Sequence, residues 1–156
     1  MARGFRMGVG GGSTSARRYL YNKGIIGITF ANPAKWWTDA SDNNNTIASQ
    51  FLTDKIYSPV TTGKLYGIGT ATQIDFSRYS SLHIKAKRLD TSSADLVFAI
   101  DTAQSFATRG LTYQNVNSSS LIEYVIDTTS INVNAYVKVV TTNYSMGFEI
   151  ESIWLE

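Results

Sequence analysis

The sequence predicts an all-β fold, an antiparallel β-sandwich that carries an extended N-terminal arm. Short runs alternate between apolar and polar residues, helix signals are scarce, and clusters of Ser, Thr, Asn, Asp and Gly separate the runs. A chain of 156 residues has the length of one domain plus a tail. We therefore expect an arm over residues 1–18 and a sandwich over residues 19–156.

The arm, MARGFRMGVGGGSTSARR, is too poor in apolar side chains to fold by itself. Ordering a backbone costs roughly 1–2 kcal/mol per residue. Burial of Phe5, Met7 and Val9 would return only about 1.5–3 kcal/mol each. We expect another molecule to order the arm, through contacts with Arg3, Phe5, Arg6, Arg17 and Arg18.

The charge of the chain is unevenly distributed. Its net charge is +2, yet residues 1–38 contain Lys and Arg and no acidic residue, so the remainder is acidic. A basic arm on an acidic body suits docking onto an acidic neighbour, including another copy of the chain. Nucleic acid is disfavoured as a partner, because the spaced arginines have no folded basic face to support them.

The first strands of the sandwich are predicted from weak runs. Residues 19–21 begin the body and residues 25–30 follow. Phe51, Ile56 and Tyr57 mark the next strand, which Pro59 closes.

The later strands have clearer patterns. In residues 82–87 the apolar positions face the core, whereas His83 and two lysines face solvent. Residues 96–100 are apolar on both faces, which is typical of a central strand covered on both sides. Residues 121–126 and 135–140 are two more strands. In the last strand the alternation slips at Ser152, which predicts a β-bulge.

The composition disfavours several chemistries. Without Cys, thiol catalysis and thiolate metal sites are excluded, and no run is long enough to cross a membrane. His83 is the only histidine, and we interpret it as an exposed strand residue with no triad, because no G-x-S-x-G motif is present. We interpret Glu149 and Glu151 as a solubilising face, and the Asp/Asn-rich residues 38–45 as a turn. We therefore expect no enzyme, no metal and no cofactor.

Two stretches of the second half resemble a known family. One is IDFSRYSSLHI, residues 74–84, and the other runs from YVIDTTS, residues 124–130, through AYVKV to IESIWLE at residues 150–156. Together they resemble jelly-roll domains in tail and appendage proteins of phages that infect Firmicutes. The opening MARGF and the segment YLYNKG, residues 19–24, are similar to the same proteins. Residues 31–69 match this pattern poorly.

The resemblance implies a carbohydrate-binding-module-like jelly roll carried on a virion, made in the host cytoplasm and acting outside the cell. It implies an adhesive or structural role without catalytic residues. Partners would be other virion proteins, further copies of the chain and a host-surface glycan. The alternative function is a purely structural one, as a capsid decoration or tail accessory protein with no ligand.

Exposed aromatic rings are the candidates for glycan contact, because sugar rings stack on flat apolar faces. Adjacent residues of an extended chain point to opposite sides, so one of Trp36 and Trp37 is predicted to meet solvent. The sequence does not decide which. Tyr113 and Tyr144, in loop-like stretches, and the nearby Arg109 complete the predicted glycan site.

Overall fold

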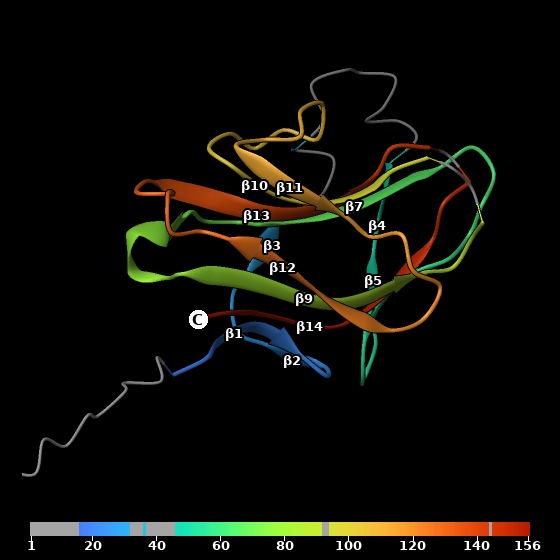
Figure 1. The fold of residues 1–156 in the computed structure, drawn as a ribbon. Coiled ribbons are helices and arrows are strands. Elements are labelled where there is room, and N and C mark those ends of the chain that lie inside the picture. The colour runs from blue at the N-terminus through green and yellow to red at the C-terminus, as the bar shows by residue number, and fades with distance from the viewer. Residues whose placement is uncertain (1–15, 32–35, 37–45, 92–93, 144) are drawn as a thin grey trace, which may run out of the picture.

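The computed structural model describes residues 16–31, 36, 46–91, 94–143 and 145–156. These residues form an all-β sandwich of two sheets, which Figure 1 shows as two layers, so the predicted fold class is confirmed at this level. No helix among the described residues has the length and apolar character needed to span a bilayer.

The first sheet has the strand order β12-β9-β14-β1-β2 (Figure 1), and β6 pairs with β14 and with β5. Its strands are β1 (Arg18–Asn22), β2 (Ile25–Ile26), β5 (Gln50–Phe51), β6 (Ile56–Ser58), β9 (Ser81–Arg88), β12 (Ile122–Asp127) and β14 (Phe148–Leu155). All pairs in this sheet are antiparallel.

The second sheet has the order β11-β10-β13-β7-β3, with β4 beside β7 and β8 beside β13. Its strands are β3 (Phe30–Ala31), β4 (Thr46–Ala48), β7 (Leu65–Thr70), β8 (Ile74–Asp75), β10 (Leu96–Asp101), β11 (Thr112–Asn115) and β13 (Asn134–Thr141). The short β4–β7 pair is parallel and the others are antiparallel. A 3-10 turn over Phe76–Arg78 follows β8.

The main core lies between the sheets, where inward side chains from both layers meet. Strand β10 is buried along its whole length, as its apolar run predicts. Phe98 belongs to the main core, whereas Val97 and Ala99 belong to a second cluster that contains Trp36 and Phe106. Since adjacent strand residues point to opposite sides, the second sheet is covered on its outer face as well.

The predicted bulge is present in β14. Its pairing with β9 shifts register between Ile150 and Ser152, so Ile150 before the shift and Ile153 after it both point into the main core.

Strands β1 and β2 form a hairpin through Lys23 and Gly24, whose φ angles are +44° and +87°. Two positive φ values are typical of a type I′ turn, which matches the twist of paired strands.

The early part of the sandwich differs from the prediction. The run over residues 25–30 is split between β2 in one sheet and β3 in the other. Strand β7 was not predicted, because Gly67 and Gly69 interrupt its apolar pattern. A Cβ atom on Gly69 would lie 2.4 Å from Cζ2 of Trp36, and one on Gly67 would lie 2.7 Å from the Phe106 ring. Both glycines therefore make room for the aromatic rings that cover this sheet.

Candidate functional site

Trp36 belongs to the covering layer of the second sheet. Its ring stacks on Phe106 with centroids 5.2 Å apart and meets Tyr136 edge-on at 5.2 Å. Trp36 is 0% exposed, so its ring offers no face to a sugar. Trp36 is therefore the ring of the predicted pair that packs inside, and it leaves the predicted glycan site, while Trp37 and Tyr144 lie outside the described residues.

A buried ion pair holds the loop over the same face. Lys138 is 0% exposed, and its Nζ donates to Asp101 Oδ2 at 2.6 Å and to the carbonyl oxygens of Ser105 and Thr108. Burial lowers the pKa of Lys138 despite the carboxylate beside it. Burial raises the pKa of Asp101, but hydrogen bonds from Lys138, the Ala103 N–H and Thr108 outweigh it and hold that pKa below its usual value. Lys138 and Asp101 therefore attach the loop that contains Ser105 and Thr108 to the second sheet.

Arg109 and Tyr113, two residues of the predicted glycan site, do lie together. Arg109 Nη1 donates to the Tyr113 hydroxyl at 2.9 Å, and its guanidinium carbon lies 4.8 Å from the ring centroid. Asp95 pairs with Arg109 and accepts a hydrogen bond from Asn115 Nδ2 at 3.2 Å. The Tyr113 hydrogen bond and then the charge of Asp95 raise the pKa of Arg109.

Tyr113 is 43% exposed and lies on the edge strand β11, opposite Ala99 of β10, and not in a loop as predicted. Its side chain therefore projects from the outer face of the second sheet, as Ala99 does. We call Asp95, Arg109, Tyr113 and Asn115 the Tyr113 patch. Sequence reasoning missed Asp95 and Asn115, although Asn115 follows Tyr113 at the two-residue spacing of one strand face.

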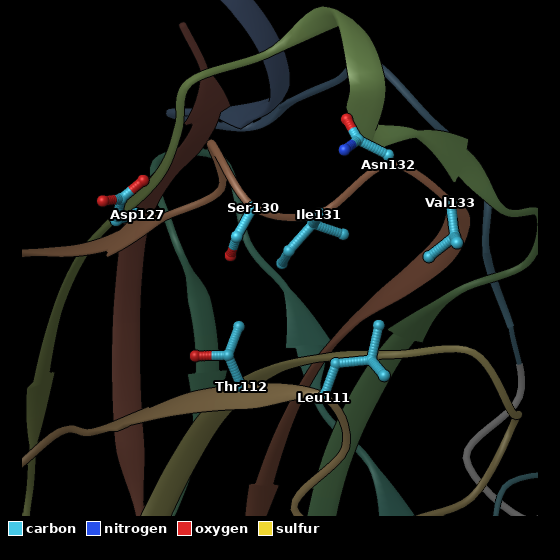
Figure 2. Close-up of a pocket in the computed structure, with 7 residues that line it drawn as sticks. All are labelled: Leu111, Thr112, Asp127, Ser130, Ile131, Asn132 and Val133. Atoms are coloured by element: carbon cyan, nitrogen blue, oxygen red, sulfur yellow. The ribbon is translucent and has the colours of Figure 1, made fainter.

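A pocket of about 340 Å³ opens at one end of the sandwich. Figure 2 shows Leu111 and Thr112 on one side of it, with Ser130, Ile131 and Val133 across from them. Asp127 and Asn132 also line it. Thr112 pairs with Ile100 of the main core, so the pocket lies on the opposite face of β11 from Tyr113 and forms a separate site.

The loop behind this pocket is held by short hydrogen bonds. Asp127 Oδ1 accepts from the Thr129 hydroxyl at 2.6 Å and from its backbone N–H at 2.9 Å, and these bonds lower the pKa of Asp127. Thr128 donates from its backbone N–H to the Ser80 carbonyl and from its hydroxyl to the Tyr79 carbonyl. The lining of the pocket thus combines the apolar side chains of Leu111, Ile131 and Val133 with the hydroxyl groups of Thr112 and Ser130.

The outer face of the first sheet is a ladder of ion pairs. Glu151 accepts from Lys85 at 2.8 Å and lies 4.0 Å from Lys23, and Glu149 contacts Lys55 and Lys87, each at 3.1 Å. Burial raises the pKa of Glu149, but the two lysines outweigh it and lower that pKa. An open depression of about 490 Å³ crosses this face, and Tyr19 and Trp154 contribute aromatic rings to its lining.

The prediction that His83 is an exposed strand residue is wrong. It lies on the outer face of β9, as predicted, but only 8% of it is exposed, because its ring stacks on Trp154 with centroids 4.8 Å apart. Its Nε2 is 2.7 Å from Ser81 Oγ and its Nδ1 is 2.7 Å from Glu123 Oε1. The ring therefore bridges a hydroxyl and a carboxylate.

The last two residues of the predicted arm contact the sandwich. Arg18 is the first residue of β1 and donates to the Tyr79 hydroxyl at 3.0 Å. Arg17 pairs with Glu156 at 2.6 Å, and its guanidinium lies 5.1 Å from the Trp154 ring centroid. The other arm residues named above, Arg3, Phe5 and Arg6, lie outside the described residues.

Comparison with known proteins gives no further guide to this chain. No protein-family model matches it, and no curated protein is significantly similar to it. Among the described residues, no group of three or more His, Asp or Glu side chains is arranged to hold a metal ion.

Proposed function

We propose that this chain is a phage virion accessory protein, in which a jelly-roll sandwich displays a weak glycan-binding site and residues 1–18 anchor it to other virion proteins. The segments that carry the family resemblance support this proposal, because they assemble into one unit. Residues 19–22 pair with the end of β14, and β14 pairs with β9. The Glu156 carbonyl also accepts from the backbone N–H groups of Ser80 and Ser81.

The exposed Tyr113 ring is the observation on which the glycan proposal depends. The ring sits on a paired strand and its hydroxyl is bonded to Arg109, so little side-chain entropy is lost when a ligand stacks on it. Arg109, Asp95 and Asn115 place donors and acceptors beside the ring, which suits a sugar's apolar face and hydroxyl rim. Binding, rather than turnover, is the role proposed for this patch.

A single such site binds weakly, and the virion context compensates for that weakness. A millimolar site corresponds to about −4 kcal/mol. Many copies on one particle raise the overall affinity by about 10²–10⁴ without any new contact. Binding to the proposed host-surface glycan therefore depends on many copies of the chain acting together.

The test is retention of the full chain, displayed in many copies on beads, on cell-wall polysaccharide from Gram-positive bacteria. Tyr113→Ala should remove most of the retention and Tyr113→Phe should keep most of it, because stacking needs the ring more than the hydroxyl. Tyr19→Ala is the matched variant on the other sheet, where Tyr19 is also partly exposed. If Tyr19→Ala loses retention on the polysaccharide and Tyr113→Ala keeps it, the glycan site lies on the first sheet. If the wild type is not retained at all, the glycan proposal is wrong.

A purely structural role is the second candidate, and the exposed end of the first sheet favours it. Ile25 and Ile26 of β2 are 71% and 53% exposed at the edge of that sheet. Apolar side chains at a sheet edge are typical of contacts between subunits. Under this alternative, Ile25→Ser/Ile26→Ser should impair incorporation into particles. Tyr113→Ala should leave incorporation unchanged, and the wild type should bind no glycan.

A further inference from the structure

The bridge through His83 has the geometry of a nucleophile, a general base and an orienting acid. Ser81 Oγ, the imidazole and the Glu123 carboxylate lie in sequence at 2.7 Å and 2.7 Å. We propose that Ser81 is an activated nucleophile that accepts a small acyl group from a carboxylic ester, with His83 as its base. This goes beyond the glycan-binding proposal and departs from the expectation that the chain has no catalytic residues.

The protonation pattern follows from the partners of the ring. An ionised carboxylate only accepts hydrogen bonds, so Glu123 requires the proton of a neutral imidazole to be on Nδ1. Nε2 is then an acceptor and takes the hydrogen bond of the Ser81 hydroxyl. This is the tautomer that a serine nucleophile needs from its base.

The three side chains come from rigid elements. Ser81 and His83 are two residues apart on β9 and therefore share one face of the sheet. Glu123 is on β12, where it pairs with Lys85 and reaches diagonally to His83. Stacking on Trp154 fixes the plane of the imidazole. Sites built on strands are more precise than sites on loops.

A second carboxylate, that of Glu156, lies near the imidazole. Glu156 Oε2 lies 3.7 Å from Nε2, so an imidazolium formed there would face two carboxylates. Arg17 balances the second carboxylate through Glu156 Oε1. Glu123 and Glu156 therefore place two carboxylates beside the ring that receives the Ser81 proton.

The proposed step transfers one acyl group. Ser81 Oγ attacks the ester carbonyl carbon and its proton passes to His83 Nε2. The bond from that carbon to the leaving oxygen then breaks, and the imidazolium returns the proton to the leaving oxygen. The products are acyl-Ser81 and a free alcohol, and attack by water along the same proton route releases the carboxylic acid.

The surroundings of Ser81 limit the substrate and the rate. Ser81 is half-buried, which favours a small acyl group such as acetyl over a large one. The backbone N–H groups of Ser80 and Ser81 both donate to the Glu156 carbonyl, so these two groups do not stabilise an oxyanion. We therefore infer slow acylation of Ser81 rather than rapid turnover.

The experiment treats the full chain with p-nitrophenyl acetate and follows both nitrophenolate release and acetylation of the tryptic peptide over residues 79–85. The wild type should gain one acetyl group on Ser81. Ser81→Ala should lose this adduct, whereas Ser80→Ala, the matched neighbour without an imidazole contact, should keep it. His83→Asn should slow acetylation by about 10²–10⁴-fold, the usual contribution of a general base.

Glu123 is a positioning residue, so its test uses a conservative variant. Glu123→Gln should slow acetylation and Glu123→Asp should restore part of the rate, a pattern that a purely structural role would not produce. Melting curves show whether each variant is folded. Labelling of Ser81 in the wild type by a fluorophosphonate is a second test that does not depend on any variant. An unlabelled Ser81 in the wild type with both reagents, or equal labelling in folded His83→Asn, would overturn the proposal. Neither result bears on Tyr113 and glycan retention.

Discussion

Lys138 shows how a single buried charge organises one face of the sandwich. The ammonium group has three N–H donors, and it donates to Asp101 and to two loop carbonyl oxygens. A charge taken out of water is tolerated when its hydrogen bonds are all made. Lys138 therefore connects β13 and β10 with the loop that covers them.

Replacement of Lys138 should destabilise the chain severely. Lys138→Met leaves the Asp101 carboxylate buried without its cation, which typically costs about 3–5 kcal/mol. Urea denaturation followed by tryptophan fluorescence measures this loss. The double variant Lys138→Met/Asp101→Asn should recover part of the stability, because it removes the uncompensated charge. A cost below about 1 kcal/mol for the single variant would contradict a structural role for the pair.

At the scale of elements, the sequence predicted strands wherever the alternation was regular. β9, β10, β12, β13 and β14 lie where their patterns placed them, and the slip at Ser152 located the bulge. β7 was missed because strand propensity counts glycine as unfavourable, whereas here Gly67 and Gly69 serve the packing of rings from distant segments. That information resides in the tertiary contact and not in the local pattern.

The site residues that the sequence predicted are those that lie close together along the chain. Arg109 and Tyr113 are four residues apart, so local reasoning brought them together. Ser81 and His83 are two residues apart on one strand, a signal that was available, but their acid partner is 40 residues away in the chain. Only the pairing of β12 with β9 reveals it. The burial of Trp36 likewise depends on a loop and a sheet that lie far from it in sequence.

Gly69 should not accept a side chain while Trp36 is present. In Gly69→Ala the new methyl group meets the indole at 2.4 Å, and overpacking of this kind typically costs about 1–3 kcal/mol. Chemical denaturation of both single variants and the double variant in a mutant cycle tests this. In a Trp36→Ala background the same substitution should cost almost nothing, and an undiminished cost there would show that the glycine has another role.

Among the described residues, the outer faces of the two sheets differ in how far they are covered. Trp36 and the loop after β10 cover the second sheet along β10 and β13 and leave Tyr113 exposed at its β11 edge. The first sheet presents its ladder of ion pairs to solvent. The N-terminal segment joins the sandwich at the first sheet, where Arg17 and Arg18 contact Trp154, Glu156 and Tyr79. Figure 1 shows the C-terminus beside β1, so both ends of the sandwich domain meet at this place.

Two truncations within the predicted arm, residues 1–18, should therefore differ in their effect on the melting temperature. Removal of residues 1–15 should leave the melting temperature of the isolated chain unchanged, because their few apolar side chains cannot offset the entropy of ordering them. Removal of residues 1–18 should lower it, since the Arg17–Glu156 pair and the pairing of Arg18 with Leu155 are lost as well. Calorimetry of the two truncated chains and the full chain measures the difference. A melting temperature that falls with the first truncation would show that the leading segment is bound by its own sandwich, which would contradict its proposed role as an arm that another virion protein orders.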